Sequence, residues 1–420
     1  MTFPAYPQYK DSGIESLGEI PSHWDVTRLP YVIFENNAGE VIDKNFWGDG
    51  SELLYTCAKQ PLLSDFRDFP ARKRTGANDL LLTRNGTPYV HLPSEGAIYS
   101  NVVQRVSLIP GIDRKFMRSA LDVATRDLVG YGVSIASFNY EMWAALRIPL
   151  PDYEEQTQIA RFLDHETARI DVLIEEQQRL IELLKEKRQA VISHAVTKGL
   201  DPTVPMKDSG VEWLGEVPAH WDVLPVWMLF QMGRGRVISH DEIAENSGDY
   251  PVYSSQTERD GVMGSIDTYD FEGDYLTWTT DGANAGTVFR RSGKFNCTNV
   301  CGTLLPKRKD DDLRYFVDAV GICTAAFIRH DINPKLMNNV MASIKVPVPP
   351  LMEQTAIAAY VSAFKDKETV LIQEAFTGIS LLQERRSALI SAAVTGKIDV
   401  RGWQPPASAQ APESAVAEAN

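Results

Sequence analysis

Polar side chains that carry hydrogen-bond donors and acceptors gather in several glycine-bounded segments. These residues are Arg84, Asn85, Ser254, Ser255, Gln256, Thr257, Thr279, Thr280, Asp281 and Asn284. Arginine pairs well with guanine, and asparagine or glutamine with adenine, so such segments suit readout of duplex DNA at the groove edges. Gly86, Gly282 and Gly286 would let the backbone approach closely or adopt a positive φ. An exposed polar turn explains any single one of these residues equally well.

Basic residues offer a second kind of contact. Lys73, Arg74, Arg290 and Arg291 suit the positioning of DNA phosphates, which fixes register without reading sequence. The formal net charge of −14 argues against a protein that coats nucleic acid indiscriminately, because sequence-independent affinity comes mainly from neutralised phosphates. A solvated loop is the commoner meaning of any one basic cluster. Charge therefore favours local rather than general contact with DNA.

The sequence contains no recognisable catalytic constellation. It has no GxxxxGK[ST] phosphate loop and no HExxH, and NPK at 333–335 is not the Asn-Pro-Pro-aromatic tetrapeptide of adenine methyltransferases. Cys297 and Cys301 lack a second Cys or His pair at zinc-site spacing, so buried free thiols explain them better. His23 and His220 each precede a tryptophan and are expected to pack or cap. We predict no catalytic residue, no metal site and no cofactor bound by this chain.

Length and composition bound the class of protein. At 420 residues, with 44% hydrophobic and 23% charged residues, the chain has room for two ordinary folded domains. No apolar run is long enough to span a bilayer, and the N-terminal segment lacks the basic start and apolar core of a signal peptide. Four cysteines are too few for a disulfide framework. We expect a cytoplasmic protein.

An internal repeat sets the domain plan. The segment KDSGIESLGEIPSHWDV from Lys10 returns as KDSGVEWLGEVPAHWDV from Lys207, with 13 of 17 positions identical. IPLPDYEEQTQIA from Ile148 matches VPVPPLMEQTAIA from Val346 at almost the same spacing. One unit has therefore been duplicated, and these constant segments form its frame.

Each copy of the frame continues into a predicted long helix. The first runs from about 154 to 196, with coiled-coil spacing in Leu163, Ile170, Leu173, Gln177, Leu180, Leu184 and Val191, widened by Ile174 and Ile181. The second carries Ile357, Val361, Phe364, Leu371, Leu381, Leu382, Leu389 and Ile390. Gly199 and Gly396 are expected C-terminal caps. Two helices of one duplicated unit pack most simply about an approximate twofold axis, which makes them antiparallel.

The contents of the frame, at about 27–147 and 224–345, diverge almost completely and are expected to be mainly β. Short segments rich in β-branched and aromatic residues predict strands, and helices are expected around 116–128 and 311–327. The predicted fold is α+β, with two mainly β domains joined and separated by the antiparallel helices. The predicted boundaries are 1–150 and 199–348 for the domains, 151–198 and 349–397 for the helices, and 403–420 for a disordered tail.

These segments resemble type I restriction-modification specificity subunits. The resemblance lies in the SGxExLGExPxHW opening, the PLPxxxEQ start of the long helix and the SHAVTKG and SAAVTGK endings. The second module also resembles one class of target-recognition domain in YPVYSSQT, YLTWTTDGANAG and CTNVCGTL. The resemblance covers nearly the whole chain and implies two target-recognition domains that bind a bipartite, asymmetric site in double-stranded DNA. Half-sites read on one face of B-DNA would lie about 34–36 Å apart, with the helices as the spacer.

The resemblance also implies the partners. Two modification subunits would methylate adenine with S-adenosylmethionine, and restriction subunits would move along DNA and cut it with ATP and Mg²⁺. The chain itself would be non-catalytic but required for both activities. Two other classes stay open, namely a coiled-coil scaffold that grips proteins without reading DNA, and a nuclease with an unrecognised site.

Overall fold

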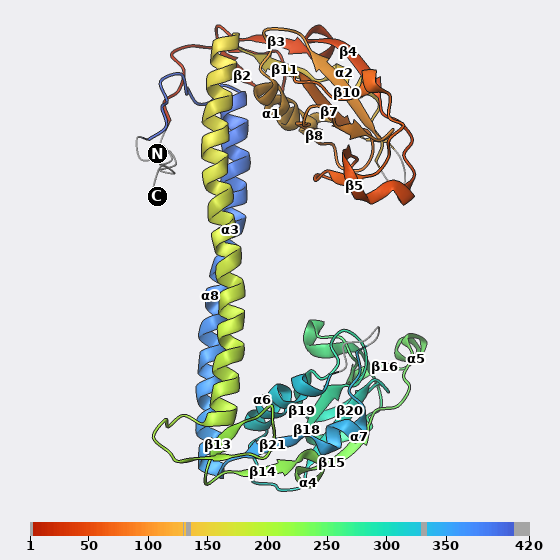
Figure 1. Ribbon diagram of the computed structural model, residues 1–420, viewed down its shortest axis with the longest axis vertical. Helices are drawn as coiled ribbons and strands as arrows, with labels where there is room; N and C mark the ends of the chain where they lie inside the picture. Colours follow the sequence, from red (N-terminus) through yellow and green to blue (C-terminus); the bar gives the residue numbers. More distant parts are fainter. Residues whose placement is uncertain (1–2, 129, 132–135, 329–333, 407–420) are drawn as a thin grey trace, which may run out of the picture. The chain divides into compact units, whose positions relative to one another are not determined.

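The chain forms two compact units. The structure is a computed structural model that describes residues 3–128, 130–131, 136–328 and 334–406. Unit 1 comprises Met1–Gln177 and Thr377–Asn420, and unit 2 comprises Gln178–Phe376. Each unit holds one copy of the frame, one module and part of both long helices (Figure 1). The α+β prediction is confirmed, whereas the domain boundaries drawn from the repeat stay a prediction.

In both units the module is entered and left through one two-stranded ladder. In unit 1, β3 (Asp25–Arg28) pairs antiparallel with β11 (Arg147–Leu150), so that Arg28 lies opposite Arg147. The same four-residue ladder in unit 2 joins β14 (Asp222–Pro225) to β21 (Lys345–Val348). An opening hairpin precedes each ladder, made of β1 (Tyr9–Asp11) and β2 (Glu19–Pro21) or of β12 (Met206–Asp208) and β13 (Glu216–Pro218).

The repeated His-Trp pair ties this ladder to the start of the long helix. His23 Nε2 lies 2.8 Å from Glu155 Oε2, and His220 Nε2 lies 2.7 Å from Glu353 Oε1. In unit 2 the buried Trp221 indole also donates to Glu353, at 2.9 Å. Among the described residues, no group of three or more His, Cys, Asp or Glu side chains is arranged to hold a metal ion. Each histidine contacts a glutamate of its own frame, His23 with Glu155 and His220 with Glu353.

The described residues of the unit 1 module form two sheets and two short α-helices. The four-stranded sheet has the order β4 (Ile33–Ala38), β10 (Val103–Leu108), β7 (Asp79–Thr83), β8 (Val90–His91). The three-stranded sheet has the order β6 (Leu62–Ser64), β5 (Trp47–Tyr55), β9 (Ile98–Tyr99). The helices are α1 (Arg114–Ala124), whose N-cap Asp113 accepts from two backbone amides, and α2 (Tyr140–Ala145).

The module of unit 2 holds a six-stranded sheet. Its order is β15 (Phe230–Arg234), β20 (Cys301–Pro306), β18 (Phe271–Thr279), β19 (Val288–Cys297), β16 (Ser247–Tyr253), β17 (Val262–Ile266). The helices are α4 (Val226–Leu229), α5 (His240–Glu245), α6 (Leu313–Thr324) and α7 (Asn338–Ser343). The buried Trp278 packs on the backbone of Gly302, where any Cβ would overlap the indole ring.

The two modules share a topology that their sequences hide. In each, a long strand pairs in parallel with a strand that comes later in the chain, β5 with β9 and β16 with β19. The paired residues are Tyr55 with Tyr99 and Tyr253 with Cys297. Each module also has a helix with an aspartate N-cap, at Asp113 and Asp312. The duplication therefore includes the contents of the frame as well as the frame.

The long helices run antiparallel within each unit (Figure 1), as predicted. They are α3 (Tyr153–Lys198) and α8 (Leu351–Val394). In unit 1, Asp171 pairs with Arg386 at 2.8 Å, while Gln158, nearer the start of α3, donates to the carbonyl of Val400 beyond the end of α8. In unit 2, Arg188 lies 3.3 Å from Glu368. Gly199 and Gly396 adopt positive φ just beyond the two helices, which confirms the predicted caps.

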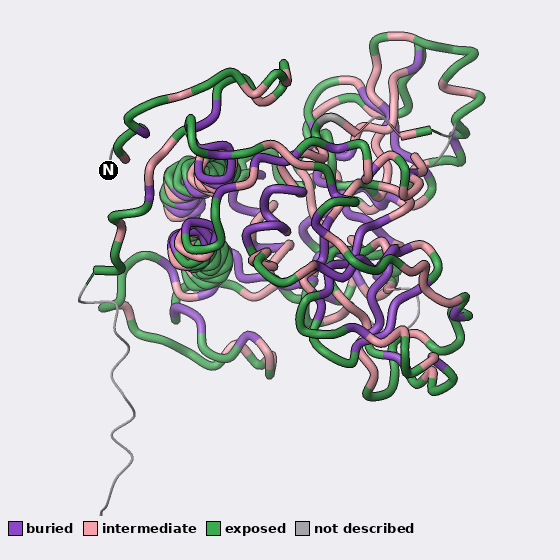
Figure 2. Tube along the Cα trace, turned by 90° about the horizontal axis from the view of Figure 1, so that it is seen from above, coloured by how far each residue is buried: buried purple, intermediate pink, exposed green. Residues whose placement is uncertain are grey.

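The buried seam of α3 differs in one respect from the prediction. Ile181 is 3% exposed, whereas Leu173 and Leu180 are 45% and 43% exposed. Viewed nearly end-on in Figure 2, each helix has buried residues along one part of its surface and exposed residues along the rest. In a heptad, successive buried positions are separated alternately by three and four residues. Where the residues three and four positions further on are both apolar, the position of the partner helix determines which of them is buried. Leu371 and Leu381 of α8 are likewise exposed.

The described residues include the first part of the predicted tail, 403–406. Trp403 packs its ring edge-on against Phe162, with centroids 5.3 Å apart, and its backbone amide donates to Val400. Beside it, the amide of Asp399 donates to the carbonyl of Pro4. Residues 407–420 of the predicted tail lie outside the described residues.

Candidate nucleic-acid interface

Two loops of unit 2 bring most of the predicted DNA-contacting residues together. One is residues 279–286, which follow β18 and are called here the glycine loop. The other is residues 254–261, which follow β16 and are called the left-handed loop. The Asn284 side chain donates to the backbone carbonyl of Ser255 at 3.3 Å, so the two loops lie side by side. Segments that the sequence offered separately therefore form one surface.

In the glycine loop, burial separates structural from accessible residues. Thr279 and Thr280 are buried, and their hydroxyls donate to the Asn284 carbonyl and the Asp281 carboxylate. Asp281 is partly exposed, but Lys335 Nζ lies 3.6 Å and Arg234 Nη2 lies 4.0 Å from its carboxylate oxygens. The two threonines shape the loop, while Asp281 with its cations and the half-buried Asn284 stay accessible to a ligand.

The left-handed loop is anchored at its ends and exposed in the middle. The Ser254 amide donates to the Gly261 carbonyl at 2.9 Å, and the Ser254 hydroxyl accepts from Thr298 at 3.3 Å. The Gln256 side-chain amide donates to the carbonyl of Val262. Ser255 is half-buried, while residues 256–260, which include Thr257, are all exposed. The loop thus offers a short run of accessible side chains on a fixed base.

The two adjacent arginines of β19 have different environments. Successive strand residues point to opposite faces, and here Arg290 is exposed while Arg291 is 2% exposed. Arg290 Nη2 lies 3.4 Å from Asp274, which leaves its predicted phosphate contact open. The Arg291 guanidinium stacks 3.7 Å from the Tyr253 ring centroid and 4.4 Å from that of Phe289. Arg291 is therefore almost fully buried, and in this structure its guanidinium is not placed to meet a phosphate.

The loop after β7 in unit 1 begins with the same backbone hydrogen bonds as the glycine loop, but it is shorter, because the amide of Thr83 donates to Tyr89 O whereas that of Thr279 donates to Thr287 O. Gly86 N donates to Ala136 O at 2.8 Å, as Gly282 N does to Pro334 O at 3.0 Å. Both glycines and Gly286 have positive φ, as predicted. The side chains differ, because Arg84 and Asn85 stand where unit 2 has Thr280 and Asp281. Arg84 and Asn85 are half-buried, and Arg84 Nη1 donates weakly to the Asn101 carbonyl at 3.4 Å.

Lys73 and Arg74 are held by acids of their own module. Lys73 Nζ lies 2.5 Å from Glu40 Oε1, and Arg74 Nη1 lies 2.6 Å from Glu52 Oε2. The Arg74 hydrogen bond lowers the pKa of Glu52 and raises that of Arg74, so the pair stays ionised. These contacts offset much of the positive charge that a phosphate would meet. To contact DNA, Lys73 and Arg74 would have to replace these glutamate partners with phosphates. Their phosphate contacts stay a prediction.

The structure adds residues that the sequence interpretation missed. Arg259 lies exposed at the tip of the left-handed loop. In unit 1 the matching loop follows Tyr55 and exposes Lys59 and Gln60. Tyr55 and Tyr253 accept equivalent backbone hydrogen bonds from Ser100 and Thr298. A tyrosine that ends a strand in both copies is the signal that could have aligned these loops.

We expect Gly86→Ala to destabilise unit 1 by about 1–2 kcal/mol, measured by urea unfolding, because φ is 81° and an L-residue is unfavourable there. A Cβ at this position meets no atom within 4 Å, so the cost is conformational rather than steric. Gly86→Asn is the matched variant and should lose less, because asparagine tolerates the left-handed region. Equal stability of wild type and Gly86→Ala would contradict the turn.

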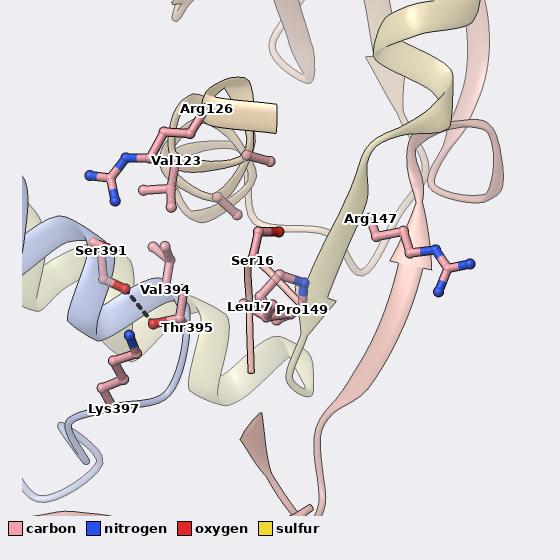
Figure 3. A pocket seen from close by; sticks show the side chains of 12 residues that line it. Ser16, Leu17, Val123, Arg126, Arg147, Pro149, Ser391, Val394, Thr395 and Lys397 are labelled. Atoms are coloured by element: carbon pink, nitrogen blue, oxygen red, sulfur yellow. Dashed lines mark hydrogen bonds between the residues drawn. The ribbon is translucent and has the colours of Figure 1, made fainter. Parts of the chain in front are cut away.

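A small pocket of unit 1 lies apart from these loops in the sequence. It has a volume of about 100 Å³, below the range of roughly 300–1,000 Å³ usual for cofactor sites. Arg126 points over it towards Ser391, whereas Arg147 points away (Figure 3). The Thr395 hydroxyl at its edge donates to the carbonyl of Ser391. We assign it no part in the interface.

Comparisons with known proteins agree on one family. The family model described as type I restriction modification DNA specificity domain matches residues 218–375. A Mycoplasma pneumoniae chain named as the N-terminal part of a type I specificity subunit is 41% identical over 132 residues, which cover 31% of this chain and 71% of that one. A second Mycoplasma pneumoniae chain, also named as a type I specificity subunit, is 41% identical over 143 residues. The match covers 34% of this chain and only 39% of the relative.

A solved structure supports the fold over most of the chain. It comes from work on complex assembly and conformational transition of the type I restriction-modification system. The TM-score is 0.67 at 14% sequence identity, covering 89% of this chain and 98% of that one. The fold and the sequence matches together define the class. This chain belongs to the family of type I restriction-modification specificity subunits.

Proposed function

We propose that this chain is the DNA-reading subunit of a type I restriction-modification complex, in which each module reads one half of a bipartite, asymmetric site. The observation that carries the proposal is the equivalent turn at the start of the loops after β7 and β18. The hydrogen bonds of Gly86 and Gly282 are equivalent, while the residues before them, Asn85 and Asp281, differ in donor and acceptor pattern. Two equivalent turns that carry different side chains suit two different DNA sequences.

The same proposal covers the partners. The chain would hold two modification subunits and, through the complex, restriction subunits, while S-adenosylmethionine, ATP and Mg²⁺ would be used by those partners. Repeat-related apolar side chains of the helices support two like partners, because each unit exposes a Val-Leu pair and a further leucine. These are Val172, Leu173 and Leu381 in unit 1, and Val370, Leu371 and Leu183 in unit 2. Exposed apolar positions on a helix are suited to packing against further helices.

A competition binding experiment tests the DNA-reading role. The purified chain with its modification subunit should bind a duplex that carries the cellular methylation site about 10³-fold or more tightly than unrelated DNA, at moderate salt. The cellular site is identified by mapping methylated adenines in DNA from cells with the intact complex. Equal binding to both duplexes would reject DNA readout and leave the protein-gripping scaffold as the explanation.

A cleavage assay addresses the nuclease alternative. The chain alone should leave supercoiled DNA intact in the presence of Mg²⁺. Cleavage that copurifies with this chain would contradict a non-catalytic subunit.

A further inference from the structure

The left-handed loop contains two non-glycine residues with unusual backbone conformations. Arg259 has φ 47° and Asp260 has φ 56°, and Gly261 follows with φ 79°. Residues other than glycine are uncommon in this region, and they persist there only where the surrounding structure holds them. Such positions cluster at binding sites, where they aim a particular side chain. The side chain aimed outwards here is that of Arg259.

A buried arginine holds this conformation from below. Arg291 Nη1 donates to Asp260 Oδ2 at 2.6 Å, and a Cβ on Gly261 would lie 3.1 Å from Arg291 Nη2. The guanidinium is stacked between Tyr253 and Phe289, so the turn rests on a rigid cation. Within the described part of the chain, Arg291 Nε has no hydrogen-bond partner. A buried cation with an unpaired donor costs folding free energy, so stability alone does not explain Arg291. Its position favours a role in fixing the turn.

Arg259 itself is exposed, and within the described part of the chain its guanidinium forms no hydrogen bond or ion pair. Its neighbours in the sequence are Glu258 and Asp260, both exposed acids. The Glu258 carboxylate repels a phosphate placed beside Arg259, whereas the charge of Asp260 is offset by its ion pair with Arg291. This repulsion makes a base edge the more suitable target for Arg259. Arginine matches guanine through two parallel hydrogen bonds to O6 and N7.

We infer that Arg259 is a specificity-determining residue that reads a guanine in the half-site of the unit 2 module, with Arg291 and Asp260 as its positioning residues. The inference rests on the proposed DNA-reading function and names one base class within it. The Gln256 and Thr257 side chains, on the same exposed run, would lie beside this contact.

The test uses the full chain in complex with its modification subunits and a set of duplexes in which each base pair of the site is changed in turn. Arg259→Ala should reduce discrimination at one G·C pair of one half-site by about 10- to 100-fold and leave the other positions unchanged. Arg308→Ala removes another exposed arginine of unit 2 and should leave the discrimination profile as in wild type.

Asp260→Asn tests the positioning role. Asp260 is exposed, so the variant should fold, which is checked by its thermal unfolding. It should weaken discrimination at the same G·C pair, by less than Arg259→Ala does, because the side chain of Arg259 remains. Loss at other base pairs instead would show that Asp260 does not act through Arg259 and would overturn the positioning role.

Three results would overturn the assignment of Arg259. A uniform loss of affinity for all duplexes, with the salt dependence reduced by about one charge, would make Arg259 a phosphate contact. Loss of discrimination at an A·T pair would contradict guanine as the base. An unchanged profile would mean that Arg259 does not touch the site. Failure of the wider proposal is recognised separately, because the wild-type complex would then show no discrimination at all.

Discussion

A chain in which residues 27–147 are replaced by residues 224–345 is expected to direct methylation to a site with two copies of one half-site. Both modules would then be the unit 2 module, and the half-site read by the original unit 1 module would be lost. Because each mismatched base pair costs about 1–3 kcal/mol, binding to the natural site should fall by at least about 10³-fold. Methylation mapping in cells that carry the altered complex measures the outcome.

The structure indicates why this exchange should fold. In both units the module begins and ends on an antiparallel ladder of four residue pairs, Asp25–Arg28 with Arg147–Leu150 and Asp222–Pro225 with Lys345–Val348. The cut points therefore lie at equivalent places on equivalent backbones. The tryptophan behind each ladder, Trp24 or Trp221, is fully buried in the frame and is not moved by the exchange.

The reciprocal exchange, with 27–147 placed in the second frame, is the matched control and should double the other half-site. If either altered chain still modified the natural asymmetric site, readout would not be divided between the modules. If all methylation were lost, size-exclusion chromatography would show whether the altered chain still folds and assembles with its partner subunits.

We expect Arg188→Leu to destabilise unit 2 by about 3 kcal/mol in urea unfolding. Glu368 is 2% exposed, and its carboxylate lies 3.3 Å from Arg188. Within the described residues neither carboxylate oxygen has a hydrogen-bond partner, so removal of the arginine leaves a buried charge without compensation. The expected loss lies at the low end of the usual range because the Arg188 side chain is 41% exposed and water can enter.

Arg188→Leu combined with Glu368→Leu is the control for this pair. Replacement of both charges by apolar groups is often neutral or stabilising, so the double variant should recover to within about 1 kcal/mol of wild type. A double variant as unstable as Arg188→Leu would show that packing, rather than the unpaired carboxylate, causes the loss.

The frame could be predicted from the sequence because its signals are local and repeated. The helix expected at 154–196 is observed as Tyr153–Lys198, and the helices expected around 116–128 and 311–327 begin at Arg114 and Leu313, each after a capping aspartate. Caps, glycine ends and apolar periodicity act over a few residues, so they can be recognised without tertiary contacts.

Side-chain accessibility could not be predicted in the same way. Hydroxyl and guanidinium side chains are typical of a DNA-contacting site, but those of Thr279, Thr280 and Arg291 are buried. Strand alternation and the neighbouring elements determine this burial. Leu173 and Leu180 fit a heptad, yet their exposure depends on which side of α3 the partner helix lies. Arg259 gave no sequence signal, because its left-handed backbone is held by Arg291, 32 residues further along the chain.

The paired ladders β3–β11 and β14–β21 have a genetic consequence. The chain enters and leaves each module through two neighbouring strands that adjoin the constant, repeated segments. A DNA crossover within those segments would therefore exchange an entire module while leaving the ladder intact. Near-identical flanks such as 10–26 and 207–223 also provide the homology that such crossovers need. Under the proposed function, a single recombination event of this kind would change one of the two recognised half-sites.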